Sequence, residues 1–276
     1  MILNLDISFQ PFSHKNEILF DHFTFSGGEP HIKIKSDLSQ EKEVMITHRI
    51  QSFNDMGLLL ITVNALRNTG ITRINLLLPY FPAARQDRLM TNGEALSVKV
   101  YSDLINGLNL NSITIFDPHS EVTPALLNHC KVLNNFKFIE QVTETLSTNL
   151  LLISPDGGAL KKIYKLAAHL QKYDVVECSK SRDIKTGQLS GFKVYANDLL
   201  GKDCLIVDDI CDGGGTFLGL AKALKAKNAG RLYLAVSHGI FSKGLDKLSE
   251  YFEIIFTTDS FRNYEKEENL EVLKFQ

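Results

Sequence analysis

Five short segments of the sequence combine charged residues and glycines in patterns that suit phosphate chemistry. The strongest is CLIVDDICDGGGTF, residues 204–217. Its glycines let backbone N–H groups approach an anion closely, and a helix that starts there adds partial positive charge. Adjacent aspartates would repel a phosphate unless they bind sugar hydroxyls or a divalent cation. A sugar phosphate carries both a phosphate for the glycines and hydroxyls for the aspartates. The alternative interpretation is a tight turn whose aspartate caps a helix. The candidate residues are Asp208, Asp209, Asp212, Gly213, Gly214, Gly215 and Thr216.

The second segment, LLLPYFPAARQDRLM at residues 76–90, is rich in arginine and aromatic residues. Arg85 and Arg88, with Gln86 between them, suit bidentate contacts to a polyphosphate, while the nearby rings suit a planar base. A solvated, charged surface loop is the competing interpretation.

Two further segments offer possible metal ligands. In ITIFDPHSE, residues 113–121, His119 follows an apolar run, and it is either a metal-site residue or a structural partner of Asp117. In LLLISPDGGALKK, residues 150–162, Asp156 could bind Mg²⁺, because hard cations prefer oxygen ligands.

The fifth segment, VVECSKSRDIKTGQLSG at residues 175–191, places Lys180 and Arg182 at the start of a polar, glycine-containing stretch. This composition is typical of a mobile loop. Such a loop can close over phosphates and stabilise charge that develops during transfer, or it can be a solvated surface loop.

The elements that must position these segments are short apolar runs. Runs of this length, each followed by a polar or glycine-rich loop, predict strands of a parallel sheet that is buried on both faces. Ligands of open parallel sheets bind beyond the carboxyl ends of the strands, where the loops described above lie. The predicted strands are residues 74–78, 113–116, 150–153, 204–207 and 232–236.

Helical spacing of apolar residues occurs between the runs. One stripe consists of Met56, Leu59, Leu60, Val63 and Leu66, with Gly70 as its predicted stop. The other stripes are Leu160, Ile163, Tyr164, Ala167 and Ala168, and then Phe217, Ala221 and Leu224 with Gly230 as a stop. Alternating strands and helices predict an α/β fold with two domains, residues 1–140 and 141–276.

Composition limits the classes of protein. With 30 Lys+Arg, 32 Asp+Glu and a net charge of −2, nucleic acid is not expected as an obligatory partner. No apolar stretch approaches the roughly 18 residues that span a bilayer, and no secretory signal is visible in MILNLDISFQ, so no membrane partner is expected. The four cysteines lack paired metal spacing and are expected to be reduced thiols, which together predicts a cytoplasmic location.

Taken together, the five segments resemble the ribose-phosphate pyrophosphokinase family, collinearly from about Phe25 to Thr258. YFPAARQDR is similar to the family's ATP-binding segment, FDPHS to its Asp-x-His metal segment and SPDGG to its Ser-Pro-Asp-x-Gly-Gly segment. IVDDICDGGGT is similar to its ribose-phosphate loop, and SHGIFSKG to its Thr-His-Gly-Phe-Phe-Ser-Gly type segment.

The resemblance implies two phosphoribosyltransferase-type domains, each a mainly parallel sheet flanked by helices. The domain of residues 1–140 would bind ATP, and that of residues 141–276 would bind a ribose phosphate. The implied reaction is transfer of diphosphate from Mg-ATP to the C1 hydroxyl of the ribose phosphate, with Mg²⁺ as cofactor and a homodimer or larger assembly.

The family's residue roles carry over onto matching positions. Arg85, Gln86, Arg88 and His119 would bind ATP, and Phe25 and Glu29 would complete the adenine site of a neighbouring subunit. His119 and Asp156 would hold Mg²⁺, Lys180 and Arg182 would be catalytic, and residues Asp208 to Thr216 would hold the acceptor.

Two departures from the family pattern bear on specificity. Gly27 stands where the family usually has Asp, and Gly213 stands where the acceptor loop usually has Thr. An all-glycine loop leaves room for a substituent on the phosphate, so ADP-ribose is an alternative acceptor to ribose 5-phosphate. Its product would be ADP-ribose pyrophosphate, a precursor for NAD⁺ synthesis. Other hypotheses are a non-catalytic regulatory homologue, and a phosphoribosyltransferase or a repressor that senses phosphoribosyl pyrophosphate.

Overall fold

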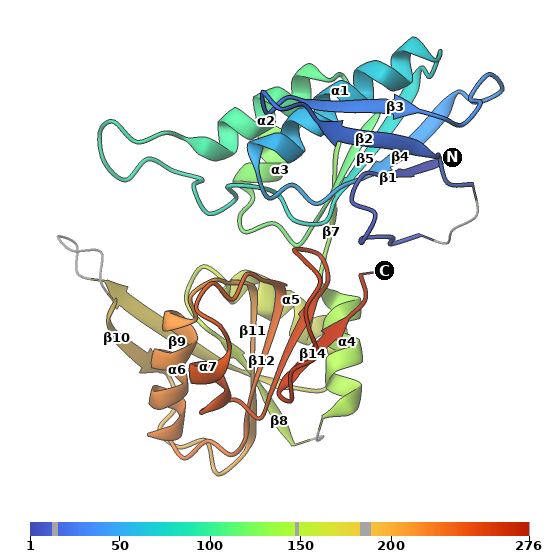
Figure 1. Ribbon diagram of the computed structural model, residues 1–276. Coiled ribbons are helices and arrows are strands. Elements are labelled where there is room, and N and C mark those ends of the chain that lie inside the picture. The colour runs from blue at the N-terminus through green and yellow to red at the C-terminus, as the bar shows by residue number, and fades with distance from the viewer. Residues whose placement is uncertain (13–15, 147–148, 183–188, 276) are drawn as a thin grey trace. The chain divides into compact units, whose positions relative to one another are not determined.

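The chain folds into two compact units, each built around its own parallel sheet. The structure is a computed structural model, and it describes residues 1–12, 16–146, 149–182 and 189–275 (Figure 1). Unit 1 comprises Met1–Asn134, Ser260–Asn263 and Lys274–Gln276, and unit 2 comprises Asn135–Asp259 and Tyr264–Leu273. The predicted α/β class is confirmed, whereas the functional division at residue 140 stays a prediction.

Unit 1 contains a sheet of five parallel strands in the order β1-β4-β5-β6-β7. A separate antiparallel hairpin is formed by β2 and β3. The strands are β1 (Ile2–Asn4), β2 (Phe20–Thr24), β3 (Pro30–Ile34), β4 (Glu43–Thr47), β5 (Arg73–Leu78), β6 (Ser112–Phe116) and β7 (Cys130–Leu133). The helices are α1 (Phe53–Asn68), α2 (Ser97–Gly107) and α3 (Val122–Leu126).

Local sequence explains how α1 begins and packs. Ser52 caps the helix, because its hydroxyl accepts a hydrogen bond from the backbone N–H of Asp55 while the Asp55 carboxylate accepts from Ser52. The predicted stripe is confirmed at Met56, Leu59, Val63 and Leu66, which are buried, and α1 ends just before Gly70. Pro30 of β3 packs against Gly57, which brings the hairpin beside α1 in Figure 1.

Unit 2 contains seven strands in the order β10-β9-β8-β11-β12-β13-β14, and only the β9–β10 pair is antiparallel. The strands are β8 (Leu150–Ser154), β9 (Asp174–Arg182), β10 (Leu189–Val194), β11 (Asp203–Cys211), β12 (Leu232–Gly239), β13 (Ile254–Thr258) and β14 (Leu270–Leu273). The helices are α4 (Phe136–Thr145), α5 (Leu160–Leu170), α6 (Gly215–Lys225) and α7 (Asp246–Ser249).

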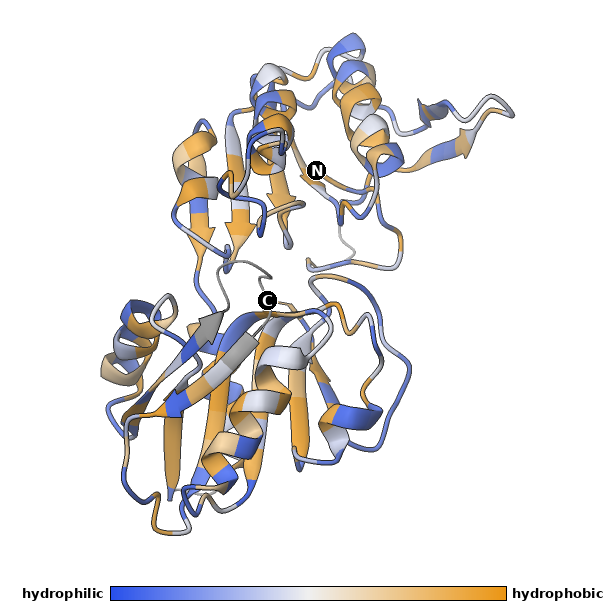
Figure 2. Cartoon of the chain, turned by 90° about the vertical axis from the view of Figure 1, so that its left-hand side faces the viewer, coloured by the Kyte–Doolittle hydropathy of each residue, from blue (hydrophilic) through white to orange (hydrophobic). Residues whose placement is uncertain are grey.

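The strands carry the apolar core of both units, as the hydrophobic colouring of Figure 2 shows. All five predicted strands are present, and Phe217, Ala221 and Leu224 are buried on α6 as predicted. Gly219 of α6 lies directly against the Phe192 ring of β10, so a larger residue there would collide with that ring.

Two details of the helix predictions are wrong. On α5, Tyr164 and Ala168 are exposed, while Ile163 and Leu166 are buried. The exposed Tyr164 hydroxyl donates to the Glu177 carboxylate (2.8 Å). Gly230 does not end α6, which stops at Lys225. Gly230 instead allows its backbone to approach the Gly201 carbonyl oxygen closely, because a Cβ atom on Gly230 would lie only 2.5 Å from that oxygen.

All four cysteines are free, as expected. In the described part of the chain, no helix combines the length and the apolar character needed to cross a membrane.

Candidate functional site

In unit 1, two loops with candidate residues leave neighbouring strands at the same edge of the sheet. The loop after β5 carries Arg85, Gln86 and Arg88, and the loop after β6 carries His119. All four side chains are exposed. Two guanidinium groups on an exposed loop at the carboxyl edge of a parallel sheet form a surface that can bind phosphates.

Asp87 joins these two loops, and sequence reasoning missed it. Its carboxyl group is buried and accepts a hydrogen bond from the Arg88 Nε at 3.2 Å. Burial raises the pKa of Asp87, but hydrogen bonds from Ser120 and Arg88 and the charges of Arg88 and His119 outweigh it and hold the pKa below its ordinary value. The signal in the sequence was an acidic residue between two arginines.

Phe25 and Glu29 lie at the turn of the β2–β3 hairpin. The backbone N–H of Phe25 donates to the Glu29 carbonyl oxygen (2.9 Å), and the Phe25 ring, half exposed, contacts the rings of Phe23 and His31. The Glu29 carboxylate lies over Gly27, with Oε2 2.6 Å from the position of a Cβ atom there. An aspartate at position 27 would therefore compete with Glu29 for this space.

In unit 2, Asp156 and Lys180 form an ion pair between neighbouring strands. The other oxygen of Asp156 accepts from the backbone N–H groups of Gly158 (2.8 Å) and Ala159 (3.1 Å) just before α5. Burial raises the pKa of Asp156, but the Lys180 ammonium and the two N–H groups outweigh it and lower the pKa overall. The structure therefore holds Asp156 ionised and fixed beside a cation.

Asp208 and Asp209 lie in the second half of β11, between the buried Val207 and the buried Ile210. Burial raises the pKa of Asp208 well above its ordinary value, and the neighbouring Asp209 carboxyl raises it further. The negative charge of Asp156 acts on Asp208 in the same direction. This concentration of acidic groups, on β11 and just after β8, would be stabilised by a cation or by hydroxyl donors.

The glycine loop, Asp212 to Gly215, connects β11 directly to α6. Gly214 has a φ of +73° and precedes the first turn of α6, which has no side-chain cap. Gly214, the N-cap residue, has no side chain that could accept from the first N–H groups of the helix, and N–H groups at a helix N-terminus are a common site for anions. A Cβ atom at Gly215 would have no neighbour within 4 Å, and Thr216 is half-buried in the first turn.

The segment after β12 also contributes to this edge of the sheet. Ser242 Oγ donates to Asp212 Oδ1 (2.6 Å), and the stem of Lys243 lies against Gly213. Sequence reasoning noticed this segment only through its resemblance to a known motif and gave neither residue a role.

Two groups of predictions remain untested. The backbone of Arg182 ends β9, but its side chain and residues 183–188, the predicted mobile loop, lie outside the described residues. His119 belongs to unit 1 and Asp156 to unit 2, so their shared metal site stays a prediction.

The match to family models covers both units. Residues 17–108 match a model described as the N-terminal domain of ribose phosphate pyrophosphokinase, and residues 128–271 match one described as a phosphoribosyl transferase domain.

Several similar proteins carry the name ribose-phosphate pyrophosphokinase. The one from Mycoplasma pneumoniae is 28% identical over 81% of this chain and 69% of its own length. The one from Corynebacterium efficiens is 26% identical over 90% of this chain and 79% of its own length. The crystal structure of phosphoribosylpyrophosphate synthetase from Mycobacterium smegmatis superposes with a TM-score of 0.81 at 22% identity, covering 94% of this chain and 87% of that one.

Proposed function

Since the chain belongs to the ribose-phosphate pyrophosphokinase family and is a diphosphotransferase enzyme, we propose that it transfers the β,γ-diphosphate of ATP to the C1 hydroxyl of ribose 5-phosphate and releases AMP. The observation that carries this proposal is the continuity of β11, the glycine loop and α6. One stretch of chain offers carboxylates for sugar hydroxyls and, directly after them, the N–H groups at the start of α6 for a phosphate.

The acceptor would bind along this stretch. Asp208 and Asp209 would accept hydrogen bonds from the ribose hydroxyls, while the N–H groups from Gly213 to Thr216 would hold the 5-phosphate. The raised pKa of Asp208 supports this assignment, because a sugar hydroxyl can donate to a carboxylate that lacks enough donors.

The donor would bind to the loops of unit 1. Arg85, Gln86 and Arg88 would hold the phosphates of ATP, with His119 beside them. The Phe25 ring is half exposed on its hairpin, which fits a role in stacking against the adenine of a neighbouring subunit.

The donor set fits a magnesium ion that is bound mainly through the nucleotide. Among the described residues, no three side chains of the His, Cys, Asp and Glu types come together as a metal cage. Mg²⁺ in phosphoryl-transfer sites keeps several waters and takes only one or two protein ligands besides the phosphates. Asp156, ionised just after the carboxyl end of β8, is a suitable oxygen ligand. His119 would be the second protein ligand, through a ring nitrogen.

The chemistry is an in-line displacement at the β-phosphorus. The C1 oxygen forms a bond to this phosphorus, the bond from it to the oxygen bridging the α- and β-phosphates breaks, and AMP departs with that oxygen. The hydroxyl proton passes to solvent. Bound Mg²⁺ would neutralise charge on the phosphates, while Lys180 and Arg182 would stabilise the charge that develops at the transferred group.

A second acceptor is favoured by one specific observation. At Gly213 the atoms nearest to a Cβ atom would be those of the Lys243 stem, 3.4 Å away, and at Gly215 no atom would lie within 4 Å. The loop is therefore open at Gly215 and bordered by a flexible lysine stem at Gly213. ADP-ribose, whose 5-oxygen carries a diphosphate, presents the same C1 hydroxyl. Its product would be ADP-ribose pyrophosphate, which could accept nicotinamide to form NAD⁺.

The experiment compares AMP release from Mg-ATP with ribose 5-phosphate and with ADP-ribose at equal concentrations. A kcat/KM that is at least about tenfold higher with one acceptor identifies the substrate, since tenfold corresponds to about 1.4 kcal/mol. Acceptor-independent AMP formation, or none with either acceptor, would refute the proposal. EDTA should abolish the reaction.

A matched pair of variants tests the donor site. Arg85→Ala should raise the KM for ATP, because it removes a phosphate contact. Arg73→Ala should not, because Arg73 lies at the opposite, amino end of β5, paired with Glu43.

A further inference from the structure

Four hydrogen bonds join the segment that follows β12 to Cys211, the last residue of β11, and to Asp212, the first residue of the glycine loop. The backbone N–H groups of Ile240 and Phe241 both donate to the Cys211 carbonyl oxygen, at 2.8 and 3.1 Å. The Ser242 N–H donates to the Asp212 carbonyl oxygen (3.2 Å), and its hydroxyl donates to the Asp212 carboxylate (2.6 Å). The residue after Ser242 is therefore held beside the glycine loop.

That residue is Lys243, and its methylene stem lies against Gly213. From the position of a Cβ atom on Gly213, the Cδ and Cε atoms of Lys243 are 3.4 Å away and Cγ is 3.7 Å away. A Cβ atom at position 213 would be in ordinary van der Waals contact with this stem. The stem of Lys243 therefore packs along Gly213.

Both positions depart from the motifs that the segments resemble. The ribose-phosphate loop usually has Thr at position 213, and the Thr-His-Gly-Phe-Phe-Ser-Gly type segment has Gly where Lys243 stands. The two departures occur in contact with each other, and together they exchange a hydroxyl inside the loop for an ammonium group at its rim.

The Lys243 side chain is exposed, and among the described residues no hydrogen bond or ion pair occupies its ammonium group. Because Cε lies 3.4 Å from the position of a Cβ atom on Gly213, the ammonium group, one bond further along, lies at the edge of the glycine loop. A phosphate held in the loop already has the loop's N–H donors. A second phosphoryl group on the same 5-substituent would carry a further negative charge, which a cation at the edge of the loop can neutralise.

We propose that Lys243 is a specificity-determining residue that contacts a second phosphoryl group, so that the preferred acceptors are riboses with a diphosphate on the 5-oxygen. The inference rests on the proposed function, since it assigns the acceptor to the glycine loop. Lysine suits this role because it places a compact, flexible charge at the end of a long stem.

The test measures binding of ADP-ribose and of ribose 5-phosphate by calorimetry, without ATP. Lys243→Met keeps the stem and removes the charge. It should lower the ratio of the association constants, ADP-ribose over ribose 5-phosphate, by at least about tenfold, the effect of one charged hydrogen bond. Lys243→Arg should bring the ratio back to within about threefold of the wild-type value, because it restores the charge. Lys247→Met, on the exposed lysine of α7, is the matched control and should not change the ratio.

Loss of both affinities by the same factor in Lys243→Met would overturn the inference, because Lys243 would then serve the phosphate that both acceptors share. An unchanged ratio would overturn it as well. If the wild-type protein binds ADP-ribose more tightly than ribose 5-phosphate but releases no AMP, the proposed reaction is refuted. The role of Lys243 in acceptor binding would remain intact. Failure of the wild-type protein to bind either acceptor would refute both.

Discussion

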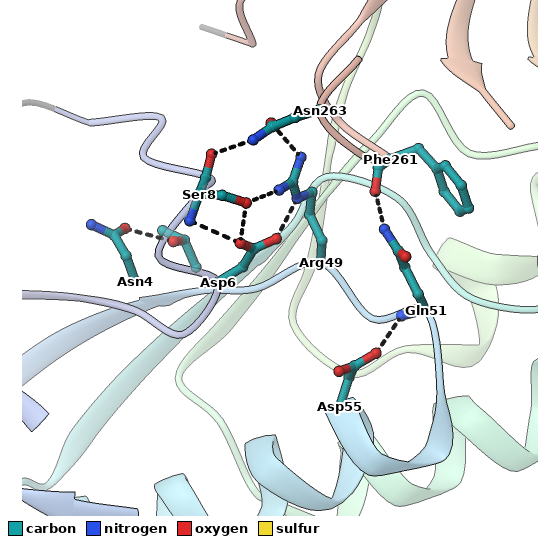
Figure 3. A network of polar contacts seen from close by, with 9 residues as sticks. Asn4, Asp6, Ser8, Arg49, Gln51, Asp55, Phe261 and Asn263 are labelled. Atoms are coloured by element: carbon teal, nitrogen blue, oxygen red, sulfur yellow. Dashed lines mark hydrogen bonds and ion pairs between the residues drawn. The ribbon is translucent and has the colours of Figure 1, made fainter. Parts of the chain in front are cut away.

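Arg49 holds three separate parts of the chain together in unit 1, and its removal should be strongly destabilising. Figure 3 shows the network. Arg49 Nε donates to Asp6 (2.6 Å), one terminal nitrogen donates to Ser8 Oγ (2.7 Å) and the other donates to Asn263 (3.1 Å). The guanidinium also lies 5.1 Å from the centre of the Phe9 ring. Asn263 belongs to the segment that returns to unit 1 after β13.

The size of the expected loss of stability follows from the burial of the ion pair. The side chains of Arg49 and Asp6 are 4% and 22% exposed, so Arg49→Met leaves a mostly buried carboxylate without its cation. Breaking a buried pair in this way typically costs about 3–5 kcal/mol. Asp6 keeps its hydrogen bonds from Ser8 and some contact with water, so we expect the lower end, about 3 kcal/mol.

Urea unfolding followed by far-ultraviolet circular dichroism measures this loss, since the chain has no tryptophan. Lys99→Met is the control, because the Lys99–Asp103 pair on α2 is 48% and 57% exposed. An exposed pair contributes about 0–1 kcal/mol. If Arg49→Met costs no more than Lys99→Met, the argument from burial is wrong.

The effect should also depend on pH. Burial raises the pKa of Asp6, but the Arg49 and Ser8 hydrogen bonds and the Arg49 charge lower it more, so the folded-state pKa lies below the unfolded value. The stabilisation is therefore fully present above the unfolded pKa of about 3.9 and is lost as the pH falls through the folded pKa. The difference between the wild-type protein and Arg49→Met should shrink as the pH falls below about 4.

Three further outcomes are expected. Lys180→Ala should lower kcat on the order of 10²–10³-fold with little change in the KM for ATP; an unchanged kcat in steady-state assays would remove Lys180 from the mechanism. Gly214→Ala should cost about 1–3 kcal/mol in urea unfolding, because φ is +73° and its Cβ would lie 3.1 Å from Leu248; a neutral result would contradict the strain. Light scattering should show a dimer or larger assembly, because the Phe25–Glu29 turn is proposed to complete a neighbour's nucleotide site; a fully active monomer would exclude that role.

The elements that carry the site were predictable from local sequence. Continuous apolar runs such as residues 204–207 and 232–236 can be buried on both faces only in a parallel sheet, and they became β11 and β12. The loops with candidate residues then had to lie at the carboxyl edge of each sheet. The composition of the glycine loop predicted an anion site by itself, because exposed backbone N–H groups at a helix N-terminus bind anions in many different folds.

Contacts between segments distant in sequence were not predictable. The Asp156–Lys180 pair depends on β8 lying next to β9, and the Asp87–Ser120 contact depends on β5 lying next to β6. Neither adjacency is encoded in the periodicity of a single strand. The same holds for Lys243, whose position depends on the hydrogen bonds between residues 240–242 and 211–212.

Transfer of the diphosphate as one intact group distinguishes the proposed reaction from simple phosphorylation and from hydrolysis of ATP. Phosphorus NMR of a reaction with Mg-ATP and the preferred acceptor should show AMP and a new diphosphate ester at the sugar C1 appearing in equal amounts. Formation of ADP with a singly phosphorylated sugar, or of AMP with free diphosphate only, would contradict the transfer of an intact diphosphate group.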